Sequence, residues 1–305
     1  MQNEIVSGRQ MAAWIFVAMT APLAQIASAG GWLQAAILGA GGWIFCLLAL
    51  GRRHPRPKWI CIVQWIWVTL TLMFLLRETA NAWPMGKGYP YIPITLALLA
   101  AWSAQKGAAA AAGAAGTIYY IVGIGFLLVL AAGLGQVSWE REWAAPKAIN
   151  DNLLLIFLLP CAAAAIPRER ETKRALPGCF AFAVVSAIVV QGILSVNGLQ
   201  GVPFYEMSRG LELLGVWERF EALACALLTV GWTALLTFLA TAAGSLVEQV
   251  AYNGYRWGVW GTVIVSVSGM LCNMRTNVAI LGIYGLICWG LLPILAQAVV
   301  SQKKM

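Results

Sequence analysis

Two prolines interrupt long apolar runs and are the residues best placed to create a binding site in this sequence. The first lies in Thr20-Ala21-Pro22 and the second in Leu159-Pro160-Cys161. Proline lacks a backbone N–H and clashes with the carbonyl one turn earlier, so it frees main-chain polar groups that lipid cannot satisfy. Such groups can bind a zwitterion or an ion, but the same prolines also fit ordinary helix kinks. The sequence fits both a binding site and a pair of ordinary kinks.

Ionisable side chains at the ends of apolar runs form the second candidate group. Charge is costly within a bilayer, so such residues tend to face a cavity or a partner. One set is Arg77 and Glu78, and the other is Glu218, Arg219 and Glu221. Each set contains both signs of charge and is predicted to form an internal ion pair or a gate. The alternative is that both sets lie at the outer interface and simply end a span.

The sequence contains no arrangement of residues typical of an enzyme. Its single histidine, His54, lies in a basic stretch, and neither a glycine-rich phosphate loop nor a paired nucleophile occurs. The seven cysteines lie in or beside apolar runs without the spacing of a metal site, which predicts small buried side chains. We therefore expect a chain that is not an enzyme and has no metal or other cofactor.

Hydropathy predicts the elements that position these residues. Of the 305 residues, 61% are hydrophobic and 10% are charged, and the mean hydropathy is +0.77. A water-soluble domain of this size could not solvate that composition, so lipid is the expected solvent. With about 20 apolar residues for each span, residues 1–305 form one all-α integral membrane domain. Ten transmembrane helices are predicted at residues 10–28, 30–50, 59–80, 91–105, 108–134, 151–166, 178–197, 217–243, 257–272 and 278–299.

The distribution of loop charge predicts the orientation of the chain. Lys and Arg are retained on the cytoplasmic side, and an even number of spans places both termini there. That side then holds 13 basic and 4 acidic residues, and the opposite side holds 7 basic and 8 acidic residues. The excess serves topology and contact with anionic membrane lipid, and nucleic-acid binding is not expected. We predict a multi-pass protein of a bacterial inner membrane, of the cell or the spore.

The predicted helices divide into two half-repeats, residues 1–135 and 151–305. Each half opens with a proline-containing helix, as in 5+5 inverted-repeat transporters with discontinuous helices 1 and 6. The first helix ends in Ala27-Ser28-Ala29, which is similar to a signal-peptide cleavage site, but Pro22 and Gln25 favour a retained functional helix. The Ala- and Gly-rich run at 107–116 predicts close packing and a central fifth helix.

Residues 203–216 predict an amphipathic helix on the outer surface. It fits a lid over an external entrance and equally an interfacial connector. Its apolar stripe is formed by Phe204, Met207, Leu211 and Leu214. Its charged face is formed by Glu206, Arg209 and Glu212.

Several motifs carry a resemblance to a known family. Ile5-Val6-Ser7-Gly8-Arg9-Gln10 precedes the first helix, and Leu76-Arg77-Glu78 is followed by Trp83-Pro84 and Tyr91-Ile92-Pro93. The most specific stretch is Pro203-Phe204-Tyr205-Glu206-Met207-Ser208-Arg209, with Trp217-Glu218-Arg219-Phe220-Glu221-Ala222-Leu223 and Gly231-Trp232 after it. In these motifs the sequence resembles the spore-germination permeases, the B-type subunits of germinant receptors, within the amino acid/polyamine/organocation superfamily.

The resemblance implies an inverted-repeat transporter fold, an amino acid or similar germinant bound between broken helices 1 and 6, and A-type and C-type receptor subunits as partners. Our main hypothesis is a receptor subunit that senses a small nutrient by a shift of conformational populations. The alternatives are an amino acid permease with alternating access and an unrelated membrane enzyme or scaffold. In both the receptor and the permease, the predicted ligand-binding residues are Thr20, Ala21, Pro22, Leu23, Gln25, Phe157, Leu158 and Pro160.

Overall fold

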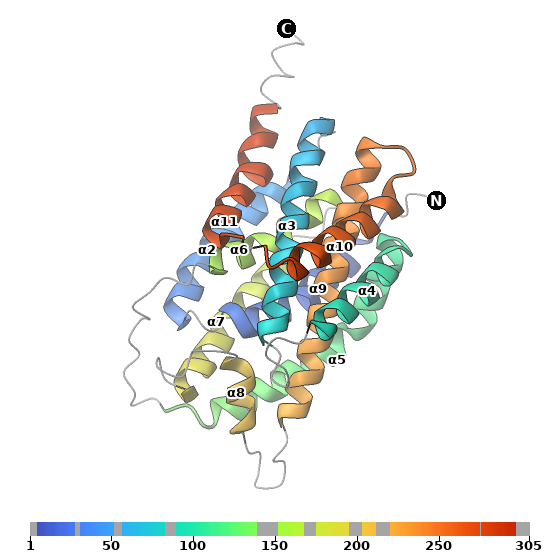
Figure 1. Cartoon of the computed structure of the whole chain (residues 1–305). Coiled ribbons are helices and arrows are strands. Elements are labelled where there is room, and N and C mark those ends of the chain that lie inside the picture. The colour runs from blue at the N-terminus through green and yellow to red at the C-terminus, as the bar shows by residue number, and fades with distance from the viewer. Residues whose placement is uncertain are drawn as a thin grey trace.

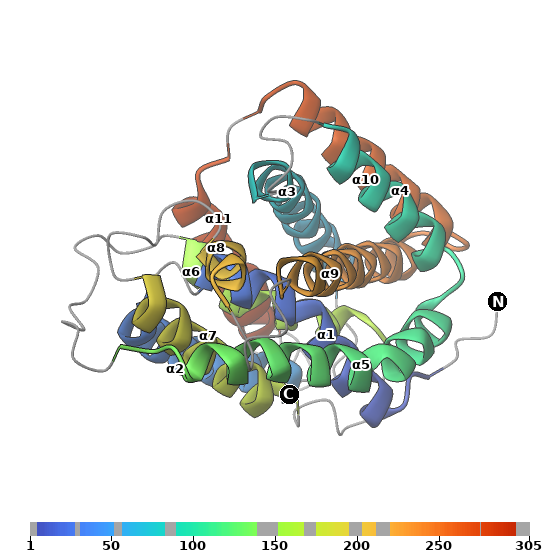
Figure 2. The ribbon, with the colours of Figure 1, turned by 90° about the horizontal axis from the view of Figure 1, so that it is seen from below.

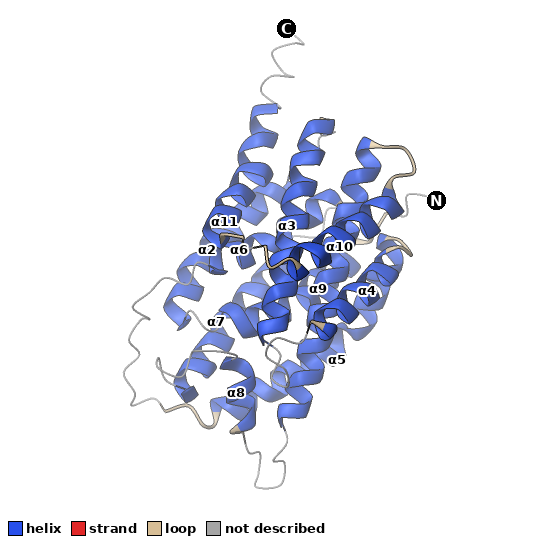
Figure 3. Cartoon of the chain, viewed as in Figure 1, coloured by secondary structure: helices blue, strands red, loops and turns tan. Residues whose placement is uncertain are grey.

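The computed structural model describes residues 5–27, 31–51, 57–82, 90–138, 152–167, 175–194, 203–211, 220–274 and 276–296. This described part is built from helices and contains no β-strand (Figure 3). Six helices are long and apolar enough to cross a bilayer, which fits a multi-pass membrane protein. They are α2, α3, α5, α7, α9 and the unit that begins with α11, and the ten-span topology stays a prediction.

Helix occupies each of the ten segments predicted from hydropathy, and one short helix is added (Figure 1). The first half contains α1 (Gly8–Pro22), the π-helical turn η1 (Leu23–Ala27), α2 (Gly31–Gly51), α3 (Lys58–Ala82), α4 (Tyr91–Ala104) and α5 (Ala108–Leu134). The second half contains α6 (Asn152–Leu158), the 3₁₀ helix η3 (Leu159–Ala165), α7 (Ala175–Leu194), α8 (Pro203–Arg209), α9 (Phe220–Val250), α10 (Tyr255–Leu271), α11 (Val278–Leu286) and the π-helical turn η6 (Ile287–Leu291).

The longest helix, α9, lies at the centre of the structure (Figure 2). Every residue from Ala234 to Leu246 is buried, so this stretch is enclosed on every face. On one side α3, α4 and α10 pack against α9 and against one another. On the other side α1, α2, α6 and α7 form a second group, joined by contacts of α2 with α6 and α7 and of α1 with α7. The chain therefore presents two helix groups that share α9.

The prediction that the fifth helix is central is wrong. Tyr120, Ile121 and Leu127 of α5 are 70%, 69% and 67% exposed, and the helix lies along one edge of the structure (Figure 2). Only one face of α5 packs, against α1, α7 and α9. Ala112 is buried on that face, whereas a side chain added at Gly123 would meet open space. Small residues thus permit a close approach, but they do not require a neighbour on every side.

The short helix α8 confirms the predicted amphipathic segment over its described part. Phe204, Met207 and Leu211 are buried, and Arg209 is exposed. The helix ends at Arg209, and residues 212–216 of the predicted segment lie outside the described residues. Because α8 packs against α7 and α9, it covers the end of both helices.

Candidate functional site

The two proline-containing helices lie antiparallel and in contact. The N–H of Val6, just before α1, donates to the C=O of Pro167, just after η3, over 3.3 Å. At the other end η1 contacts α6, and between them α1 contacts η3. The beginning of each helix therefore lies beside the end of the other, so that η1 packs against α6 and η3 packs against α1.

The first helix changes its winding at Pro22 without unwinding. The N–H of Leu23 donates to the C=O groups of Met19 and Thr20, and the chain continues as the π-helical turn η1. The predicted discontinuity in helix 1 is thus corrected to a widened turn. Such π-helical turns occur inside α-helices frequently at functional sites.

The sixth helix tightens instead of widening. From Leu159 it runs as a 3₁₀ helix of 7 residues with Pro160 in its first turn, although such runs rarely exceed about 4 residues. The side-chain amide of Gln249, on α9, donates to the C=O of Ala165 at its far end over 3.3 Å. Helix 6 is therefore also continuous over its described residues, and the end of its 3₁₀ segment is held by α9. A stretch of 3₁₀ within a longer helix often marks a hinge.

Helix α9 fills the space beside η1. The Nε1–H of Trp232 donates to Oε1 of Gln25 over 2.6 Å, and both side chains are buried. A Cβ atom added to Gly231 would lie 2.8 Å from Cβ of Ala21 and 2.9 Å from Oγ1 of Thr20, so the two helices touch at a distance that only glycine allows. The predicted site in the first helix is closed by α9.

The predicted residues of the sixth helix are equally well packed. Phe157 lies against α2, where a Cβ atom at Gly39 would come within 3.0 Å of its ring, and its C=O accepts from the Cys46 thiol over 3.2 Å. Leu158 faces α11, where a Cβ atom at Gly285 would lie 3.1 Å from Cδ1 of Leu158. The structure therefore buries all eight predicted ligand-binding residues, Pro22, Leu23 and Pro160 included.

Of the predicted ionisable group at the start of the eighth span, the structure describes Glu221. Its carboxylate forms an ion pair with Nε of Arg209, on α8, at 3.8 Å, and Arg209 also pairs with Glu206 at 3.5 Å. These side chains are about half exposed, so each pair contributes at most about 1 kcal/mol. Glu218 and Arg219 lie outside the described residues. Glu221 thus joins α9 to the amphipathic helix, a role that the sequence did not indicate.

Arg77 and Glu78 lie half-buried near the end of α3. Neither forms an ion pair with another described residue. Thr79 beside them is fully buried, and its hydroxyl donates to the C=O of Leu75 over 2.7 Å. The arrangement favours the interpretation that these residues end the span, and a gating role stays a prediction.

A stripe of hydroxyl groups along α9 was missing from the sequence-based prediction. Four threonines recur at every fourth position, and each hydroxyl donates over 2.7–2.8 Å to the C=O of the residue four positions earlier. The helix thereby satisfies its own polar side chains in apolar surroundings. The spacing was visible in the sequence at Thr229, Thr233, Thr237 and Thr241.

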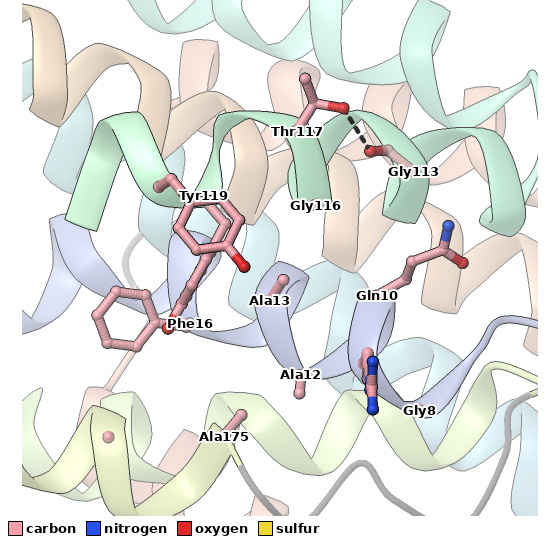
Figure 4. Close-up of a pocket in the computed structure, with 13 residues that line it drawn as sticks. Gly8, Gln10, Ala12, Ala13, Phe16, Gly113, Gly116, Thr117, Tyr119 and Ala175 are labelled. Atoms are coloured by element: carbon pink, nitrogen blue, oxygen red, sulfur yellow. Dashed lines mark hydrogen bonds between the residues drawn. The ribbon is translucent and has the colours of Figure 1, made fainter. Parts of the chain in front are cut away.

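A groove along α1, α5 and α7 was also not predicted (Figure 4). It has a volume of about 600 Å³, and Arg9 is the one charged residue among the 13 described residues that line it. At one end the Gln10 side chain reaches toward Gly113 of α5 (Figure 4). At the other end the rings of Phe16 and Tyr119 lie edge to face, 5.4 Å apart. There the groove continues into an apolar cavity of about 430 Å³ between α5 and α7.

Neither a scan of protein-family models nor a search of curated proteins finds a match to this chain. The resemblance carried by the motifs therefore stays a prediction.

Proposed function

We propose that this chain is the transmembrane subunit of a spore germinant receptor and senses a small nutrient, such as an amino acid, where the helix formed by α1 and η1 packs against the helix formed by α6 and η3 (the crossing of α1 and α6). One observation carries the proposal: two antiparallel helices in contact both change their winding at a proline. Irregular helix segments within a membrane protein present main-chain N–H and C=O groups that suit a zwitterionic ligand. The buried position of both segments gives a ligand a water-excluded site.

Four pairs of helix contacts support a 5+5 inverted repeat of ten transmembrane helices as the fold of this receptor, although the contact of α1 with α9 has no equally extensive counterpart between α6 and α3. With α8 set aside, the counterparts five helices apart are α1 and α6, α2 and α7, α3 and α9, α4 and α10, and α5 and α11. The contact of α1 with α5 then corresponds to that of α6 with α11, and α1 with α7 corresponds to α6 with α2. In the same way the contact of α4 with α9 corresponds to the contact of α10 with α3. The contact of α5 with α9 corresponds to the contact of α11 with α3. An odd number of spans in each half inverts the second half relative to the first.

In the proposal, the packed arrangement is the ligand-free, closed conformation. Gln25 is the polar side chain of η1 that a nutrient would bind, and Trp232 holds it while the site is empty. The ammonium group of an amino acid replaces the indole N–H as donor to Oε1 of Gln25. A ligand shifts the conformational equilibrium only if it binds the open form more tightly. Separation of Gln25 from Trp232 supplies that difference.

An amino acid permease with alternating access is the second candidate. The correspondence between the two sets of helix contacts favours it, because inverted repeats that rock against each other alternate the access to a fixed site. Both candidates place the chain in a bacterial inner membrane, of the cell or the spore, with both termini cytoplasmic. The receptor alone requires A-type and C-type subunits as partners.

A thermal-shift screen of the common amino acids against the purified full chain in detergent tests the proposal. We expect at least one amino acid to raise the Tm, and the variant Gln25→Leu to abolish that rise. The matched control is Gln64→Leu, because Gln64 is also a buried glutamine. Its side chain donates to the C=O of Cys288 on η6. The absence of any stabilising amino acid, or an equal rise in Gln25→Leu, contradicts the proposal.

Uptake into proteoliposomes separates the two candidates. A receptor subunit binds the stabilising amino acid without accumulating it, whereas a permease accumulates the labelled compound inside the vesicles. Gln25→Leu removes accumulation in the second case. Accumulation above the external concentration by the unmodified chain would replace the receptor with the permease.

A further inference from the structure

We propose that the groove along α1, α5 and α7 binds one anionic phospholipid, with the headgroup phosphate at Arg9 and one acyl chain along α5. This site is separate from the crossing of α1 and α6, and it does not depend on the proposed function. None of the eight predicted ligand-binding residues lines the groove. The occupant is inferred from the charge at one end and the apolar walls at the other.

The polar end of the groove suits a phosphate group. Arg9 lies exposed in the first turn of α1 and forms no ion pair with any other described residue. Next to it the hydroxyl of Ser7 donates to Oε1 of Gln10 over 3.1 Å, which leaves the NH₂ of Gln10 directed to the α5 side of the groove (Figure 4). A guanidinium and an amide N–H are both donors to phosphate oxygens, and the charged one forms the stronger hydrogen bond. None of the described residues that line the groove is acidic.

The rest of the groove suits a hydrocarbon chain. Its walls beyond Gln10 consist of small residues such as Ala13, Gly116 and Gly178, followed by aromatic rings and then by Ile124 and Leu127. From residue 113 to residue 130, α5 advances by about 25 Å at about 1.5 Å per residue. Half of the bilayer core is about 15 Å thick. The groove is therefore long enough to take an acyl chain from the interface to the bilayer midplane.

Charge complementarity selects an anionic lipid over other occupants. A neutral lipid or a second apolar helix would fill the apolar end and bring no negative charge to Arg9, which pairs with none of the described acidic residues. The distribution of Lys and Arg predicts that the first turn of α1 faces the cytoplasm, and anionic lipids concentrate in that leaflet. The lipid phosphate and the guanidinium of Arg9 therefore both lie at the cytoplasmic interface of the bilayer.

Native mass spectrometry of the full chain released from nanodiscs tests the site. The nanodiscs contain equal amounts of phosphatidylglycerol and phosphatidylcholine. We expect one retained phosphatidylglycerol per chain, and about a tenfold lower retention in Arg9→Gln, as for the loss of one charged hydrogen bond of about 1.5 kcal/mol. The matched control Lys106→Gln removes a charge from the same predicted side, where Lys106 lies over the ring of Trp102 outside the groove. It should retain the lipid.

A second pair of variants tests the apolar end. Gly123→Leu fills the cavity, and the control Gly41→Leu makes the same change on α2. A Cβ atom at either position meets nothing within 4 Å. We expect Gly123→Leu to lose the retained phosphatidylglycerol and Gly41→Leu to keep it. The proposal is overturned if Arg9→Gln and Lys106→Gln retain equal amounts of phosphatidylglycerol, or if the two leucine variants do. It is also overturned if the unmodified chain retains phosphatidylcholine equally well, or if a second copy of the chain is bound in place of lipid.

Discussion

The two ends of α1 meet their neighbours in opposite ways, although glycines face both. At the C-terminal end a Cβ atom on Gly231 of α9 would lie 2.8 Å from Cβ of Ala21. At the N-terminal end Gly113 and Gly116 of α5 would gain a Cβ atom with no neighbour closer than 3.9 Å. A glycine therefore closes one interface and leaves the other open. The difference arises because α9 approaches α1 closely at its glycine, whereas α5 does not approach α1 closely at either of its glycines.

This contrast assigns different roles to the two regions. A ligand at the α1–α6 crossing has to displace protein contacts, above all the hydrogen bond between Trp232 and Gln25. Binding there must change the conformation, as a sensor or a transporter requires. The groove beside Arg9 already has its volume, so a lipid can occupy it in the closed conformation. Variants of residues in each region test these two roles.

The largest effect is expected from Trp232→Ala. The indole is fully buried and bonded to Gln25, so its removal leaves a cavity and costs about 3–5 kcal/mol of unfolding free energy. Unfolding by sodium dodecyl sulfate in mixed micelles measures the loss. The control is Trp257→Ala, because Trp257 is 81% exposed. Equal losses in the two variants would show that Trp232 does not hold the crossing closed.

A smaller effect is expected from Gly231→Ala. The added methyl group would lie 3.1 Å from the backbone N of Ala21 as well as against its side chain, and overpacking of this kind costs about 1–3 kcal/mol. The same substitution at Gly116 should be neutral or stabilise by up to about 1 kcal/mol, because alanine is the better helix former. Thermal unfolding of both variants gives the comparison. Equal destabilisation at Gly116 would mean that the groove is not open.

Helix positions followed from hydropathy because apolar runs are a local property of the chain. The fifth helix has the predicted bounds, Ala108–Leu134. The helix α9 instead continues past the predicted end at residue 243 to Val250, where polar side chains make contacts with other helices that hydropathy does not register. Gln249 is the example, because its amide binds the end of η3. Such a contact joins residues 84 positions apart and leaves no local signal.

The candidate site was predictable only in its local part. Pro22 and Pro160 marked both changes of winding because a missing N–H acts within one turn of helix. The closing contact of Gln25 with Trp232 joins residues 207 positions apart, so the prolines alone suggested an open gap. Glycines are ambiguous for the same reason. Gly116 predicted close packing of α5, and the structure uses it to line a groove.

The most direct test of the account follows Trp232 itself during ligand binding. The 15 tryptophans of the full chain are replaced by 5-fluorotryptophan, and the ¹⁹F resonance missing from Trp232→Phe identifies Trp232. We predict that the stabilising amino acid shifts this resonance, because the bond to Gln25 opens, and leaves the resonance of exposed Trp257 in place. An unchanged Trp232 resonance at saturating amino acid would contradict a ligand site at the crossing of α1 and α6.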